Sequence, residues 1–220
     1  MDKKGFTLAE VLITLGIIGV VAALTLPTLI SNYRKQEVVA RLKKFYSILS
    51  QAIILSENDN GPSKEWTKVY YGGLEDASNK TLALNYFNNY LKAYIKYTQI
   101  DENPPAINSA STINSNIRIY LSDGSYFYMK NGACMDIDYD VNGSKAPNAY
   151  GADIFKFIIC PEEKYKNECG SDKNFCPYCP IANCNTREKA LQKCKTSPAT
   201  CAKILMMDGW EFKKDYPHKL

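Results

Sequence analysis

Histidine is nearly absent from this chain of 220 residues, which holds only His218. Catalytic triads that use a histidine base, and metal sites rich in histidine, are therefore excluded unless a partner supplies the imidazoles. The sequence also lacks the patterns GxxxxGK, HExxH and GxSxG. The formal net charge is only +4, too small an excess to favour nucleic acid as a partner. We expect a protein that is not an enzyme and requires no cofactor.

The most apolar stretch stands at the N-terminus, where Lys3 and Lys4 precede a run from Phe6 to Leu26. Its length is close to the roughly 20 residues with which a helix crosses a bilayer. One acid, Glu10, interrupts the run. A carboxylate inside a membrane costs about 2.5 to 3.5 kcal/mol on insertion scales. Glu10 is therefore predicted to have a function.

A family resemblance rests on KKGFTLAE at residues 3–10, with Gly16, Gly19 and Pro27 downstream. This segment resembles the leader and helix start of type IV pilins and type II secretion pseudopilins. The resemblance implies partners of three kinds: a prepilin peptidase, other pilin or pseudopilin subunits, and secretion or pilus assembly machinery in the membrane.

The resemblance also implies roles for three residues. The peptidase would cleave after Gly5, the new amino group of Phe6 would be methylated, and Glu10 would serve filament assembly. Cleavage gives Phe6 an α-ammonium group, and the Glu10 of a neighbouring subunit can pair with it. In a low dielectric such pairing of two costly charges matters most.

Two other interpretations of the N-terminus remain open. One is an ordinary secretory signal peptide cleaved near Ala22-Ala23, and the other is a plain membrane anchor. The signal peptide is disfavoured because its apolar region is usually 7–15 residues long and carries no acid. The plain anchor leaves Gly5-Phe6 and Glu10 unexplained.

Orientation in the membrane is indicated in two opposite ways. More Lys and Arg follow the span (Arg34, Lys35, Arg41, Lys43 and Lys44) than precede it, which by the positive-inside rule places the C-terminal side in the cytoplasm. The resemblance implies the bacterial inner membrane, crossed once, with the C-terminal head outside the cytoplasm. We follow the resemblance because the cysteine usage agrees with it.

The pattern of the remaining chain predicts an α+β fold: a long N-terminal helix, partly transmembrane, packed on an antiparallel β-sheet, with a disulfide-rich C-terminal extension. Pro27 is expected to end or kink the first part of the helix. Apolar residues from Val38 to Ile53 recur at helical spacing, and Asn58–Pro62 ends the helix. A second helix is expected at 82–97, an exposed linker at 101–115, strands at 117–121, 126–129, 133–139 and 153–159, and a last strand within 204–220.

These elements divide the chain into four parts. We expect a prepilin leader at 1–5, a transmembrane and amphipathic spine helix at 6–57, a pilin-like globular head at 58–159 and a cysteine-rich extension at 160–220.

An acidic turn after the third expected strand is a candidate calcium site. Asp138, Asp140, Asn142 and Gly143 match the opening of an EF-hand-type loop, which places oxygen ligands at alternate positions. The closing position falls on Ala149, where a Glu would be needed. Calcium is therefore one interpretation, and a solvated turn between strands is the other.

All eight cysteines lie in the second half of the chain: Cys134, Cys160, Cys169, Cys176, Cys179, Cys184, Cys194 and Cys201. An even count in an exported chain favours four disulfides, which could be drawn in 105 ways. Two alternatives stay open, a redox dithiol at Cys176-Pro177-Tyr178-Cys179 and a zinc site that combines this pair with other cysteines.

These observations favour a pilin-like structural subunit that polymerises through its N-terminal helix. A type II secretion pseudopilin is preferred to a subunit of a type IV pilus or a competence filament. The alternative is a membrane-anchored, disulfide-rich surface binding protein that does not polymerise.

Overall fold

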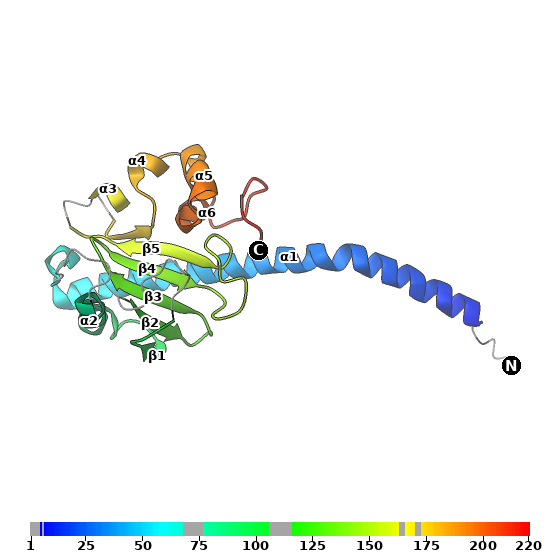
Figure 1. The fold of residues 1–220 in the computed structure, drawn as a ribbon, viewed down its shortest axis with the longest axis horizontal. Helices are drawn as coiled ribbons and strands as arrows, with labels where there is room; N and C mark the ends of the chain where they lie inside the picture. The colour runs from blue at the N-terminus through cyan, green and yellow to red at the C-terminus, as the bar shows by residue number, and fades with distance from the viewer. Residues whose placement is uncertain (1–4, 6, 68–76, 106–115, 163–165, 170–172) are drawn as a thin grey trace.

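The computed structural model describes residues 5, 7–67, 77–105, 116–162, 166–169 and 173–220. One long helix emerges from a head in which it packs against a six-stranded antiparallel sheet (Figure 1). A lobe of short helices covers the end of the sheet formed by its last strands. The predicted α+β, pilin-like fold is thereby confirmed.

Helix α1 (Leu8–Asn60) runs without interruption through Pro27. Of the two expected effects of Pro27, an end or a kink, the end is therefore wrong. A proline removes one backbone donor, but the hydrogen bonds of the turns on either side can still carry the helix through. Gly61 follows the last turn, so the predicted end within 58–62 is confirmed.

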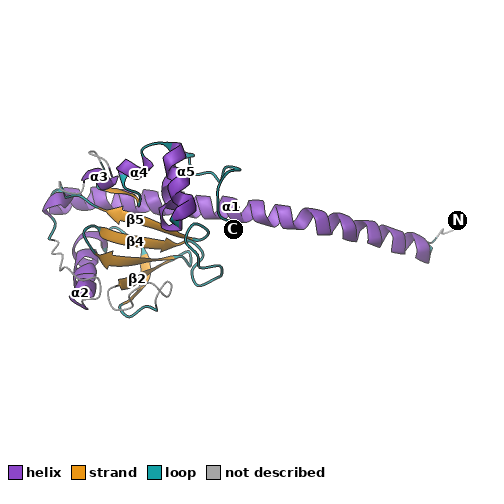
Figure 2. Cartoon of the chain, turned by 45° about the horizontal axis from the view of Figure 1, so that its top comes forward, coloured by secondary structure: helices purple, strands orange, loops and turns teal. Residues whose placement is uncertain are grey.

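The two halves of α1 meet different surroundings. Its N-terminal half projects beyond the head, whereas its C-terminal half lies along the sheet (Figure 2). The buried residues of the second half follow the predicted stripe: Val38, Leu42, Phe45, Leu49, Ala52 and Ile53. Spacing of three and four residues places them on one face, which forms part of the head core.

The sheet follows chain order, and each strand is antiparallel to the next. Its strands are β1 (Tyr97–Asp101), β2 (Asn116–Leu121), β3 (Tyr126–Asn131), β4 (Met135–Asp140), β5 (Ile154–Ile159) and β6 (Phe175–Pro177). The four central strands were predicted. Sequence reasoning missed both edge strands, because β1 is polar and β6 has only three residues.

The second helix begins and ends earlier than predicted. Helix α2 spans Ala77–Tyr86 and continues into a π-helical turn over Phe87–Leu91. The aromatic face predicted for this region supplies Tyr86, Phe87 and Leu91 to the core. Of the predicted linker at 101–115, residues 106–115 lie outside the described residues.

Aromatic rings join the spine to the sheet. The ring of Phe45 stacks on Tyr139 of β4, with centroids 3.9 Å apart and planes within 1°. The same ring makes tilted contacts with Phe127 and Phe157, from the strands on either side. Fully buried aromatic pairs of this kind contribute beyond their buried area, so Phe45 anchors α1 at the centre of the head.

The C-terminal lobe is helical where a last strand was expected. It contains α3 (Lys166–Cys169), α4 (Ile181–Cys184), α5 (Arg187–Thr196) and α6 (Cys201–Met207). The prediction of a strand within 204–220 is wrong, because the buried residues of α6 follow helical spacing and the tail beyond it is irregular. Arg187 fixes that tail through ion pairs with Asp208 and Asp215.

A polar contact also ties the spine to the head. Lys44 of α1 pairs with Asp123 in the β2–β3 turn at 2.8 Å. Burial alone would raise the pKa of Asp123, but hydrogen bonds from Lys44 and Ser125 outweigh burial and lower the pKa to about 2. The stabilisation is therefore present above the unfolded pKa of about 3.9 and is lost as pH falls toward 2.

Lys44→Met should lower the free energy of unfolding at pH 7 by at most about 1 kcal/mol, because the pair is partly exposed. The difference from wild type should shrink as pH falls from 4 to 2. Thermal unfolding of the full chain in detergent, followed by circular dichroism, measures it. Lys43→Met, at the neighbouring exposed position, is the control, and a difference that persists at pH 2 would contradict this account.

Candidate functional site

The first turn of α1 brings Glu10 back onto Thr7. Thr7 is the N-cap residue, and both its backbone N–H and its hydroxyl donate to Glu10 Oε2 at 2.8 Å. In return the Glu10 N–H donates to Thr7 Oγ1 at 3.3 Å. This capping box satisfies donors that the start of a helix leaves without partners. Of the two predicted processing residues, Gly5 is exposed just before the cap, and Phe6 lies outside the described residues.

The apolar part of α1 is bare in this single chain. The large hydrophobic side chains from Leu8 to Ile30 are at least 42 % exposed, and Leu8 itself is 77 % exposed. In the described part of the chain, α1 alone is long and apolar enough to cross a membrane. A surface of this size is covered by lipid or by other apolar helices, because water around it would be costly. This helix fits a membrane-anchored, single-pass protein.

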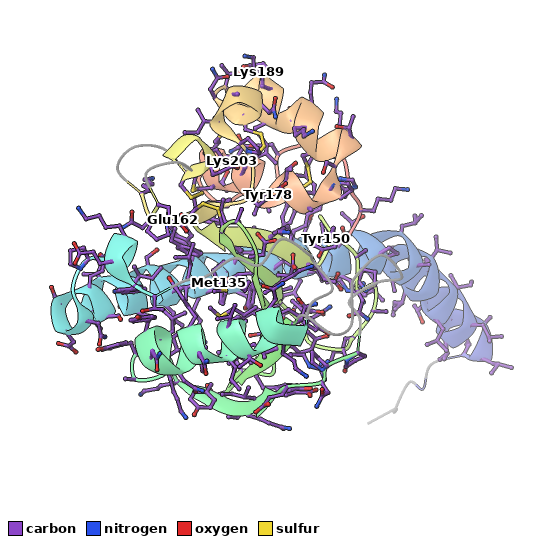
Figure 3. All side chains as sticks on the ribbon, turned by 60° about the vertical axis from the view of Figure 1, so that its left-hand side comes forward. Met135, Tyr150, Glu162, Tyr178, Lys189 and Lys203 are labelled. Carbon is purple, nitrogen blue, oxygen red and sulfur yellow. A yellow bond between two sulfur atoms is a disulfide. The ribbon has the colours of Figure 1, made fainter. Side chains whose placement is uncertain are left out.

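The acidic residues of the predicted calcium site occupy the face of β4 opposite the core. Asp138 is partly buried, the hydroxyl of Tyr150 bonds to it, and the charge of Lys156 is close. Burial raises the pKa of Asp138. Burial also raises the pKa of Asp140 to about 7, although the Asn142 N–H donates to Asp140 Oδ1. Figure 3 shows Tyr150 in the region between the sheet and the lobe.

Nearby, Asp153 is held by the protein itself. Its carboxylate accepts hydrogen bonds from the backbone N–H groups of Asn148 and Ala149, at 2.8 and 2.7 Å, and from Asn142 Nδ2. Two oxygens of the predicted site, Asp138 Oδ1 and Asn142 Oδ1, are buried without a hydrogen-bond partner. Open acceptors suit a cation, and calcium binding at Asp138, Asp140 and Asn142 stays a prediction.

All eight cysteines form disulfides: Cys134–Cys160, Cys169–Cys176, Cys179–Cys184 and Cys194–Cys201. The two cysteines of the CPYC segment therefore have different partners, so the redox dithiol and the four-thiolate zinc site are both wrong. One group of Cys194, Cys201 and His218 has metal-ligand spacing, but its two sulfurs are bonded to each other. His218 is partly buried, with Nε2 3.0 Å from the Cys194 carbonyl oxygen.

Sequence reasoning missed a cluster around Arg118 on the outer face of the sheet. The guanidinium lies 4.8 to 5.7 Å from the ring centroids of Tyr120, Tyr126 and Tyr128, and it pairs with Asp101 at 2.9 Å. The alternation of these residues on two strands joined by a hairpin was the available signal, because residues two apart share a face. The arrangement locks β1, β2 and β3 together.

Comparison with known proteins gave two family matches. The model of a family of unknown function (DUF6613) matches residues 28–220, and the model of the prokaryotic N-terminal methylation motif matches residues 1–26. The second is the prepilin-type signal of type IV pilins and pseudopilins, so the resemblance found in the sequence is confirmed. No curated protein and no solved structure matches the chain.

Calcium added at millimolar concentration should release or absorb heat in titration calorimetry and raise the unfolding midpoint of the full chain. The effect should be stronger at pH 8 than at pH 6, because calcium needs the ionised form of Asp140, whose pKa is about 7. Asp140→Asn should remove it, and Asp59→Asn, an acid on the distal end of α1, should not. If calcium at pH 8 causes neither heat in calorimetry nor a shift of the unfolding midpoint, the calcium site is ruled out.

Proposed function

Because the chain belongs to the family of unknown function DUF6613 and begins with the prokaryotic N-terminal methylation motif, we propose that it is a pilin-like structural subunit that polymerises through α1. The filament we favour is a type II secretion pseudopilus, ahead of a type IV pilus. One observation carries the proposal: the half of α1 outside the head is bare and apolar, and it carries one acid in its first turn. A plain anchor would need the apolar surface but not the acid.

Assembly gives Glu10 a second partner. In the single chain its carboxylate accepts two hydrogen bonds from Thr7, so the precursor can rest in the membrane with this charge hydrogen-bonded at the helix start. Cleavage after Gly5 by a prepilin peptidase creates an ammonium group at Phe6. In the filament, the Glu10 of one subunit then exchanges its contact with Thr7 for the ammonium of its neighbour. Uncut precursor has no such group, so processing controls assembly.

The location we propose is the bacterial inner membrane, with the head outside the cytoplasm and the assembly machinery in the same membrane. The four disulfides support this orientation, because disulfides persist mainly in oxidising compartments. The five cations that follow the span favour the opposite orientation under the positive-inside rule, with the head in the cytoplasm. Long exported domains commonly cross regardless of such charges, so we give the disulfides more weight.

A second candidate function is a membrane-anchored surface binding protein that does not polymerise. The observation that favours it is the disulfide-bonded lobe, which adds a second small core beside the sheet. Figure 3 shows Lys189 at the outer end of this lobe, on the side away from the sheet. A binding protein of this kind would need the anchor and the lobe but would not need Glu10.

The intact mass of the protein extracted from native membranes tests the processing step. We expect a mass lower by residues 1–5 and higher by one methyl group, because the motif directs cleavage before Phe6 and methylation of its amino group. Replacement of Gly5 by a bulkier residue is the control and should leave the precursor mass. A full-length mass in the wild type, or cleavage near Ala23, would overturn the proposal.

Glu10→Gln separates the two roles of this side chain. The amide oxygen can still accept from Thr7, so the helix start and membrane insertion should survive, but the charge that pairs with a neighbour is lost. We expect incorporation into sheared or cross-linked filaments to fall at least tenfold, since loss of one partner of a buried pair is strongly destabilising.

Thr7→Val is the matched control for Glu10→Gln. It removes the hydroxyl of the capping box and leaves the Glu10 charge, so filaments should still form. Normal incorporation of the Glu10→Gln variant would favour the anchored binding protein instead.

A further inference from the structure

We propose that a cavity at the base of the head binds the headgroup of an anionic phospholipid. The cavity has a volume of about 290 Å³ and lies where α1 leaves the head. Four parts of the chain form its walls: α1 between Arg34 and Arg41, the β2–β3 turn at Asp123-Gly124, the loop between β4 and β5, and Leu220. In Figure 1 this loop curls beside α1 at the end of the head from which the bare half of the helix projects.

The cavity lies at the depth of lipid headgroups. From Leu8 to Tyr33 the helix is 25 residue steps long, or about 38 Å at a rise of about 1.5 Å per residue. A bilayer with its headgroup regions is about 40–45 Å thick. The apolar surface ends at Ile30, and Tyr33, Arg34 and Lys35 follow. An aromatic residue and two cations in succession are typical of the boundary between membrane and water, so Arg34 faces the headgroups of the leaflet next to the head.

The acidic side chains that line the cavity already have partners within the protein. Glu37 pairs with Arg41 at 3.0 Å, and Asp123 pairs with Lys44 at 2.8 Å. Asp153 accepts two backbone N–H groups within its own loop. Two of the three carboxylates therefore have a cationic partner, and the third is held by hydrogen bonds within its own loop.

Two cations of the cavity remain available. Arg34 and Lys145 are both exposed, and within the part of the chain that the structure describes neither forms an ion pair or a side-chain hydrogen bond. They come from different walls, α1 and the β4–β5 loop. A guanidinium and an ammonium that line one cavity suit a phosphodiester group, which accepts charge-assisted hydrogen bonds from both.

The walls of the cavity are held together by Arg41. Arg41 donates from Nη1 to the carbonyl oxygens of Asp123 and Val141, at 3.2 and 3.0 Å, and so joins α1 to both loops. Val38 and Pro147 add apolar surface beside the charged groups. Free phosphate has no carbon atoms that could pack on this apolar surface, whereas the glycerol group of a lipid has them. We therefore assign the cavity to a membrane lipid.

The inference depends on the membrane span of α1 and not on polymerisation, so the two proposals can fail separately. Its test uses the full chain in a zwitterionic detergent, mixed with equal amounts of phosphatidylglycerol and phosphatidylcholine. Native mass spectrometry then counts the lipid molecules that each protein retains. We expect one phosphatidylglycerol to be retained in preference to phosphatidylcholine.

The double variant Arg34→Gln, Lys145→Gln should lose at least about tenfold of this retention, because each cation near a membrane surface adds appreciably to anionic lipid binding. Lys35→Gln is matched in depth and charge but lies outside the cavity lining, so its retention should stay within about twofold of wild type. Lys145→Glu, a single change in an exposed loop, gives a second variant that should also reduce retention.

Three results would overturn the inference. Equal retention of both lipids would show that the charge of the headgroup is not recognised. An equal loss in Lys35→Gln would show a general attraction along α1 and no defined site. Full displacement of the lipid by millimolar inorganic phosphate would identify a site for the free anion. The circular dichroism spectrum and unfolding midpoint, expected to match wild type, ensure that each variant is folded.

Discussion

The structure depends on one constraint: a single uninterrupted helix must be stable in two surroundings, an apolar one along its first half and a partly aqueous one along its second half. Along its first half α1 carries apolar residues on every side, as a helix in lipid or in a helical bundle requires. Along its second half the apolar residues narrow to one stripe, because the other faces meet water. The change occurs between Ile30 and Val38, where cations begin. The head is built around the stripe and cannot form its core without it, since Phe45 lies among the rings of three strands.

Most of the fold could be predicted because its signals are local. The hairpin turn at Asp123-Gly124 and the alternation of β2 and β3 define the centre of the sheet without any knowledge of tertiary contacts. Where the structure departs from prediction, contacts distant in sequence decide. Three residues at 175–177 become a strand only because β5 offers an open edge. Helix α6 lies where a strand was expected, and it packs on α5, to which the disulfide between Cys201 and Cys194 joins it.

The candidate functional site likewise has one part that could be predicted from the sequence and one part that could not. Glu10 could be identified from its sequence alone, since an acid inside an apolar run stands out whatever surrounds it. Its contact with Thr7 could also have been predicted, because a capping box is defined by two residues three positions apart in the sequence. By contrast, the cavity near Arg34 combines a helix with a turn and a loop that lie more than 80 residues further along the chain, as the bond from Arg41 to Asp123 illustrates. No periodicity in the sequence predicts that these three segments lie together.

The disulfide connectivity has a consequence for the order in which the four bonds can form. Every cysteine is joined to the next cysteine along the chain, from Cys134–Cys160 to Cys194–Cys201, so no loop encloses another. Of the 105 possible patterns, this is the one that a chain oxidised as it emerges, N-terminus first, reaches without any exchange of partners. Each thiol meets its correct partner before a wrong one is available. The lobe can therefore mature on an oxidant alone, independently of an isomerase.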